Sequence, residues 1–348
     1  MRRGAWKPII GAASMNFTAS IVLRIAPALA AGAIALGASV AASAGIRVVA
    51  SIKPVHSLVS AVMAGVGEPR LLIRGRASPH IFTLRPSDAA ALADADVVFL
   101  IGETLETSIA RAIETLARKA RVVALADSEG LVRRPLRGGG AFEPVPPREP
   151  AEDRAKGDSR GRPDPDRGRP GRGRGVFDMH VWLDPVNGGT MARAIAHALS
   201  QADPANAARY EANARTLLPR LDALAKQVST ELAPVRAKPF VVFHDGYRYF
   251  EDRFGLNAVG SVVVSPERSP GAKRLRRLRA KMRELDVACV FAEPQFNKRI
   301  VDVVLEGSKT RSGVIDPLGT DIEDGPELYF TLLRNMAAAF KGCLATGV

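Results

Sequence analysis

Aromatic side chains are scarce in this 348-residue chain, at 5% of the sequence, although the chain is strongly basic with a net charge of +13. Proteins that bind nucleic acid usually combine their cations with aromatic side chains on which bases stack. Here the arginines gather in two stretches, residues 133–174 and 273–283, and aromatic residues do not interleave with them. The composition therefore argues against nucleic acid as a partner.

Apart from residues 25–40, the chain also lacks the long apolar runs that cross a membrane. Even this run is short for a helix that spans about 30 Å of hydrocarbon. It follows a basic segment and precedes small residues ending at Ala44, which is the pattern of an export signal. We interpret residues 1–44 as a signal peptide, with Met15 as an alternative start, and we expect the mature protein to be soluble in the periplasm.

Only two cysteines occur, Cys289 and Cys343. In an oxidising compartment two such residues can form a disulfide, whereas cysteines in a cytosolic chain usually stay reduced. The composition leaves both states open: a bridge between the two residues, or two buried thiols.

Regular patterns are missing from residues 133–175, which are rich in arginine, glycine and proline. Such a segment has too little apolar surface to offset the entropy lost on ordering, so we predict a disordered loop. Its arginines could tether the protein to anionic surfaces, but a tolerated insertion is the simpler interpretation.

Elsewhere, short apolar runs alternate with amphipathic stretches; the run over residues 46–52, for example, precedes a helical pattern over 54–63. This alternation is typical of a parallel sheet covered by helices on both faces. Apolar residues at steps of three and four predict one long helix over residues 203–234. We therefore predict an α/β protein with one lobe over 45–202, this connecting helix, and a second lobe over 235–348.

The chemistry-bearing residues stand out by their place in this pattern. His80, His180 and His244 each lie at or near the end of a predicted strand, whereas His56 and His197 lie inside predicted helices and are interpreted as packing or surface residues. Ligands collect at the carboxyl ends of the strands in open α/β sheets. We therefore expect the first three imidazoles to converge between the two lobes.

His180 belongs to a segment, residues 176–185, in which apolar and polar side chains alternate. Alternation of this kind predicts a strand with one core face and one face that carries Asp178, His180 and Asp184. Pro185 has no N–H to donate, so the predicted strand ends there.

Three imidazoles suit zinc, which bonds nitrogen at about 2.0–2.1 Å and can keep a fourth position open. Asp316, which follows another predicted strand, is the candidate fourth ligand; Asp245 is a candidate to orient the ring of His244, and Glu293 a candidate with a structural, binding or supporting role. Because imidazole must be neutral to bind a metal, zinc affinity should fall below about pH 6.

Six short blocks, in this order along the chain, resemble the periplasmic zinc-binding protein of bacterial zinc-uptake ABC transporters. They are VASIKP at 49–54, His80 with LRPSD at 84–88, MHVWLDP at 179–185, FHDGY at 243–247, FAEPQF at 291–296 and DPLGT at 316–320. The blocks cover nearly the whole mature chain, and together they are specific.

The resemblance implies a cluster A-I solute-binding fold with zinc held by His80, His180 and His244 and passed to a permease in the inner membrane. A histidine at position 244, where manganese-binding relatives have a carboxylate, favours zinc. The resemblance also implies a disulfide between Cys289 and Cys343. Zinc-binding relatives often carry a histidine-rich loop before the His180 segment, but residues 133–174 contain no histidine.

The leading hypothesis is therefore a monomeric zinc carrier without catalytic residues. Manganese or iron binding and a metal-binding adhesin of the same fold are the alternatives. A zinc hydrolase is a further alternative, but the His-Glu-x-x-His spacing of zincins is absent and no carboxylate is placed as an obvious general base.

Overall fold

The computed structural model describes residues 45–137, 177–263, 266 and 269–345. The predicted signal peptide and residues 138–175 of the arginine-rich segment lie outside this range. Among the described helices, none is long and apolar enough to cross a membrane.

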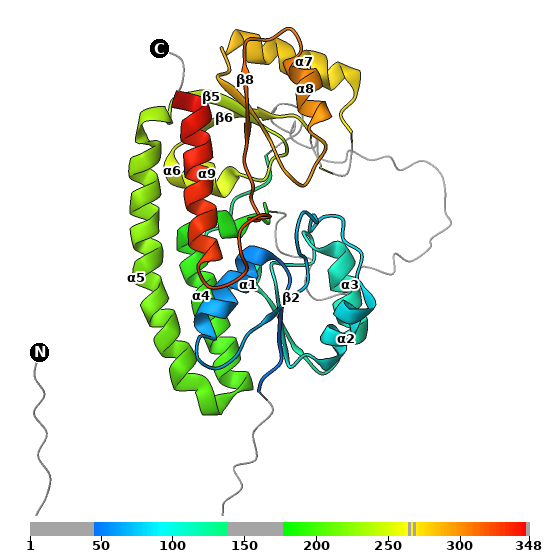
Figure 1. Ribbon diagram of the computed structural model, residues 1–348, viewed down its shortest axis with the longest axis vertical. Coiled ribbons are helices and arrows are strands. Elements are labelled where there is room, and N and C mark those ends of the chain that lie inside the picture. The colour runs from blue at the N-terminus through cyan, green and yellow to red at the C-terminus, as the bar shows by residue number, and fades with distance from the viewer. Residues whose placement is uncertain (1–44, 138–176, 264–265, 267–268, 346–348) are drawn as a thin grey trace, which may run out of the picture. The chain divides into compact units, whose positions relative to one another are not determined.

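Two parallel four-stranded sheets, one from each half of the sequence, organise the structure (Figure 1). The first sheet has the order β2-β1-β3-β4 and the second the order β6-β5-β7-β8, so the two sheets share one topology. The predicted α/β class is confirmed. The strands are β1 Val48–Ala50, β2 Arg70–Leu71, β3 Val97–Leu100, β4 Arg121–Ala124, β5 Pro239–Val242, β6 Asn257–Ser261, β7 Cys289–Ala292 and β8 Arg311–Val314.

Helices connect successive strands of each sheet, as parallel pairing requires. The α-helices are α1 Lys53–Val62, α2 Pro86–Asp94, α3 Thr107–Leu116, α4 Pro185–Ala202, α5 Ala207–Leu232, α6 Arg248–Phe254, α7 Ala272–Glu284, α8 Arg299–Leu305 and α9 Leu328–Ala345. Short 3-10 helices flank some of them: η1 Leu125–Asp127, η2 Val181–Leu183, η3 Pro204–Asn206 and η4 Ala233–Val235.

Helix α5 is the long helix predicted between the two halves, and it runs past both sheets in Figure 1. It packs against α1, α4 and α9. The residues that it buries recur at steps of three and four: Tyr210, Ala214, Leu217, Leu221, Leu224, Val228 and Leu232. One hydrophobic core therefore includes side chains from both sheets and from these shared helices.

The strand predicted over residues 176–185 is wrong. Phe177 forms a single bridge with Pro135, and the chain then turns into η2, whose three residues are all buried. The turn has a local cause, because the Asp178 side chain accepts a hydrogen bond from the His180 backbone N–H at 3.0 Å. Asp184 then caps the N-terminus of α4 by accepting from the Val186 N–H.

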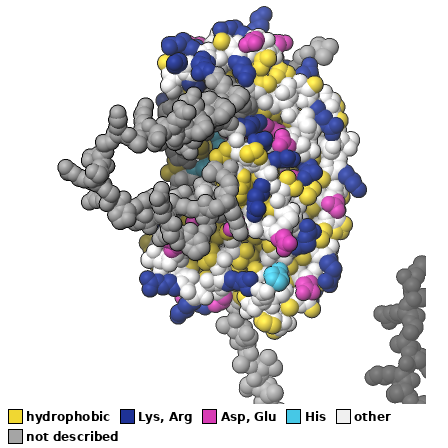
Figure 2. Space-filling view, turned by 180° about the vertical axis from the view of Figure 1, so that it is seen from behind, with side chains coloured by type: hydrophobic (Ala, Val, Ile, Leu, Met, Phe, Trp, Pro, Cys, Tyr) yellow, Lys and Arg dark blue, Asp and Glu magenta, His cyan; other side chains and the backbone are white. Residues whose placement is uncertain are grey.

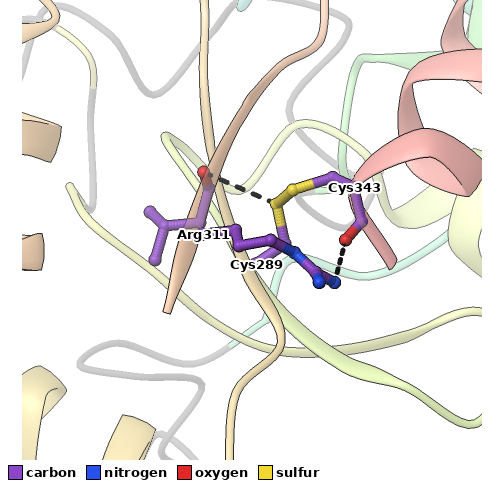
Figure 3. The surroundings of a disulfide bond; sticks show 4 residues. Cys289, Arg311 and Cys343 are labelled. Atoms are coloured by element: carbon purple, nitrogen blue, oxygen red, sulfur yellow. Dashed lines mark hydrogen bonds between the residues drawn. A yellow bond between two sulfur atoms is a disulfide. The ribbon is translucent and has the colours of Figure 1, made fainter. Parts of the chain in front are cut away.

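A disulfide joins Cys289 in β7 to Cys343 in α9 (Figure 3). This is the pairing that the family resemblance implies. The Arg311 guanidinium in β8 also donates to the Cys343 carbonyl, so α9 is fixed to two neighbouring strands of the second sheet. Since α9 also packs on α1, these bonds hold the last helix where both halves of the chain meet.

One carboxyl group is buried at the end of the first sheet. Glu106 precedes α3 and is 0% exposed, and its Oε2 atom accepts a hydrogen bond from the Gly102 backbone N–H at 2.9 Å. Burial raises the pKa of Glu106 to about 7, because a charged carboxylate loses its hydration there.

Candidate metal centre

Three histidines converge where the carboxyl ends of the two sheets meet. His80, His180 and His244 each bring one ring nitrogen to within 4.8 Å of the others, and their ring centroids are 5.1–5.7 Å apart. Across the residues that the structure covers, this is the one cluster of at least three such side chains able to hold a metal ion.

Each imidazole comes from a different part of the chain. His80 lies in the loop after β2, His180 immediately precedes η2, and His244 follows β5. The order of strands reverses between β5 and β7, and such switch points are where open α/β sheets place their ligand sites. His244 after β5 and Glu293 after β7 lie at this point.

A buried carboxylate orients His180. The Nδ1 atom of His180 lies 2.7 Å from Asp178 Oδ1, and both side chains are buried. Burial opposes the charge of Asp178, but the interactions with His180 outweigh it and lower the pKa of this carboxyl. An ionised Asp178 accepts a hydrogen bond from the Nδ1–H of the ring, so Nε2 is unprotonated and its lone pair is available to a metal ion.

His244 has an equivalent partner in Glu293. Its Nδ1 atom lies 2.6 Å from Glu293 Oε1, and both residues are buried. Burial opposes a charge on His244, yet the carboxylate of Glu293 raises the pKa of the ring. Again the carboxylate binds Nδ1 and leaves Nε2 facing the cluster.

The distance between the two oriented nitrogens fits a metal ion. His180 Nε2 and His244 Nε2 are 3.2 Å apart. A tetrahedral zinc ion with bonds of about 2.0–2.1 Å separates neighbouring ligand atoms by about 3.3 Å. These two ring nitrogens lie at the spacing of two ligands of one divalent cation, and each ring is hydrogen-bonded to a carboxylate through its other nitrogen.

His80 is the third member and is held differently. Burial, followed by the nearby His180 and His244 rings, lowers the pKa of His80 to about 2. This imidazole is therefore neutral at any physiological pH, as a metal ligand must be.

The other candidates lie elsewhere. His56 is buried in α1 with Nε2 3.0 Å from the Pro69 carbonyl oxygen, and His197 is exposed on α4 beside Gln201. Asp316 is outside the histidine cluster, where its Oδ1 atom accepts hydrogen bonds from Gln295 and from the Leu318 N–H.

The expectation that Asp245 orients His244 is wrong, since Glu293 occupies that position. Asp245 instead accepts hydrogen bonds from Arg137, at 2.9 and 3.1 Å to its two oxygens. Arg137 also donates to the buried Glu251 in α6 at 2.7 Å. Residues 133–137 are thus ordered against α6, which corrects the prediction of disorder for the start of the arginine-rich segment.

The described residues on either side of 138–176 contact α6. Arg134 pairs with Asp252 at 3.1 Å, and its backbone N–H donates to the Tyr249 hydroxyl at 3.0 Å. The same hydroxyl donates to the Asp178 carbonyl at 2.7 Å, two residues before His180. Helix α6 therefore braces the segment that carries one histidine against the sheet that carries another. No motif in the sequence indicated this role for residues 134–137.

Trp182 adds a second link across the site. Its ring lies against His180, with 5.2 Å between centroids, and its Nε1–H donates to the Pro317 carbonyl at 2.8 Å. A small pocket beside His80 and His244 is lined in part by Trp182, Glu293 and Gln295.

Two sheets of parallel strands, each covered by helices, and a histidine cluster at their carboxyl ends are the features of a two-lobed solute-binding protein. Comparison with known proteins gives the family: residues 48–343 match the family described as zinc-uptake complex component A, periplasmic (ZnuA). The chain belongs to this family.

Curated relatives agree. The high-affinity zinc uptake system protein ZnuA of Brucella suis is 45% identical over 319 residues, covering 86% of this chain and 91% of the relative. The protein of the same name from Paracoccus denitrificans is 35% identical over 299 residues, with the same coverage. A crystal structure of a ZnuA superposes with a TM-score of 0.70 at 21% identity, covering 86% of this chain and 99% of that one, which shows a shared fold.

Proposed function

We propose that this chain is a periplasmic zinc carrier that binds one Zn²⁺ between His80, His180 and His244 and delivers it to the permease of an ABC transporter. The observation that carries the proposal is the pair of Nε2 atoms 3.2 Å apart, each on a ring whose Nδ1 is bound to a buried carboxylate. Membership of the zinc-uptake family supports zinc as the cargo and a membrane transporter as the partner.

A carrier role also fits the chemistry of the site. Asp178 and Glu293 are the carboxylates nearest to the rings, and each is bound to an imidazole rather than placed to activate a water molecule. We therefore propose binding without catalysis. A water molecule or Asp316 completes the coordination, the latter after releasing Gln295.

The division of the chain follows from the same proposal. Residues 45–202 form one lobe and residues 235–348 the other, with α5 connecting them, and residues 1–44 are the export signal. The three proposed ligands come from a single chain, so the site is complete in a monomer, and we propose a monomeric carrier.

The decisive experiment is to replace His180 with alanine and measure zinc in the purified protein. The wild type should retain one tightly bound zinc in competition with manganese, and His180→Ala should lose it. His197→Ala is the matched control, since it removes an exposed histidine from α4 and should leave the zinc content unchanged. Stoichiometric zinc in a folded His180→Ala protein would refute the proposal.

A further inference from the structure

Helix α7, which packs against the second sheet, carries a high density of positive charge. Of its 13 residues, seven are lysine or arginine, and Glu284 at the end is the one acidic residue. Like charges at helical spacing repel one another, so this density has a cost in stability. The histidine cluster does not use these residues, since its members come from other segments.

Arg274 and Arg279 of this helix bond to neighbouring elements. Arg274 donates to the Ser261 and Val262 carbonyls at 2.6 and 2.9 Å, which fixes α7 to the end of β6. Arg279 donates to the Val304 carbonyl in α8 at 3.3 Å. These two guanidinium groups serve the packing of the helix.

Helix α7 has one apolar side that is buried and one charged side that faces solvent. Leu278 and Met282 are buried in the hydrophobic core of the second sheet. Lys273, Arg276 and Arg283 are exposed on the other side, at steps of three and seven residues. We call these three residues the basic row. At a rise of about 1.5 Å per residue, the row extends over about 15 Å of helix.

Figure 2 shows lysine and arginine side chains gathered at the end of the molecule where Figure 1 places α7. A small residue, Ala280, lies between Arg276 and Arg283, and none of the 13 residues of the helix is aromatic. The basic row therefore offers charge on long flexible side chains without an aromatic anchor among them.

We propose that the basic row is a docking surface for the anionic phospholipid headgroups of a membrane. A plane of phosphates requires only cations that can reach it, and lysine and arginine side chains extend their charge beyond the helix surface. Protein interfaces, in contrast, depend on aromatic or apolar anchors seated in pockets, and the row has none. The absence of aromatic residues from α7 also disfavours nucleic acid.

This role goes beyond the binding of zinc and uses different residues. A carrier that is held loosely at a membrane surface searches for its transporter in two dimensions, which raises the rate of encounter. Because the attraction is electrostatic between exposed groups, it should weaken with salt.

The experiment measures co-sedimentation of the mature, zinc-loaded protein with lipid vesicles. Vesicles that contain about 30 mol% phosphatidylglycerol in phosphatidylcholine should bind the wild type at about 0.05 M salt, more weakly at about 0.15 M, and pure phosphatidylcholine should not bind it. The triple variant Lys273→Gln, Arg276→Gln and Arg283→Gln should bind the anionic vesicles about 10- to 100-fold more weakly.

A second triple variant is the matched control: Arg209→Gln, Arg215→Gln and Lys226→Gln remove the same charge from exposed positions on α5. This variant should retain most of the vesicle binding. Equal loss in both variants would show that net charge alone is responsible and would overturn the proposal, as would a wild type that does not bind anionic vesicles.

Zinc content and circular dichroism of all three proteins separate this test from that of the proposed function, because every variant should fold and bind zinc. If the α7 variant lost transporter stimulation in detergent, without lipid, the row would instead bind an acidic protein surface and the lipid assignment would be overturned.

Discussion

Glu106 should make the stability of this protein depend on pH in a way that one substitution removes. The carboxyl is fully buried, so the folded protein holds its proton up to a pKa of about 7, whereas an exposed glutamate releases it near 4.5. Glu106→Gln has nearly the same shape, keeps an oxygen for the Gly102 N–H and carries no charge at any pH.

The expected magnitude follows from the two pKa values. Between about pH 4.5 and pH 7 the folded chain keeps a proton that the unfolded chain has lost, so the free energy of unfolding falls as the pH rises. Above about pH 7 both states are ionised and the loss is complete. At about 1.4 kcal/mol per pH unit, the wild type should lose about 3 kcal/mol relative to Glu106→Gln over this range.

Urea unfolding of the metal-free proteins at intervals from about pH 4.5 to 8 measures this difference. Glu103→Gln, which changes an exposed glutamate three residues earlier, is the matched control for the removal of a charge. A difference between wild type and Glu106→Gln that stayed constant over the whole pH range would refute the assignment of a protonated carboxyl at this site.

Two further predictions concern the surroundings of the histidines. Glu293→Gln should weaken zinc binding about 10- to 100-fold, measured by competition with a chelator, because His244 loses the carboxylate that fixes its Nδ1 proton; unchanged affinity would exclude this role. Arg137→Ala should lower the free energy of unfolding by about 3 kcal/mol near pH 8, because it leaves the carboxylates of Asp245 and Glu251 without their cation. The loss should be smaller near pH 5.5, because burial raises the pKa of Glu251 to about 7 and the group is then neutral; an equal loss at both pH values would contradict this explanation.

The sequence was most informative where one physical rule acts alone. Buried parallel strands require continuous apolar runs, so β1, β3, β5 and β7 were visible as such runs, and helix α5 was visible from the spacing of its buried face. The rule that ligands collect at strand ends predicted that His80 and His244 would lie together, and it also selected His180, which lies in the same cluster although residues 177–185 are not a strand.

Predictions based on sequence proximity were wrong where a side chain contacts a residue far away in the sequence. Asp245 is adjacent to His244 but points to Arg137, whereas Glu293, 49 residues away, reaches the ring because β5 and β7 are neighbours. Alternation failed around His180, because the Asp178 side chain bends the backbone by bonding to the His180 N–H. No local pattern reports either contact.

The bridge between Pro135 and Phe177 has an evolutionary consequence. Pro135 and Phe177 lie side by side, so the sequence between them can change length while these two residues and the histidine cluster keep their positions. Closing a loop twice as long costs only about 0.6 kcal/mol more. The number and identity of the residues between Pro135 and Phe177 can therefore change without a change in the positions of the three histidines.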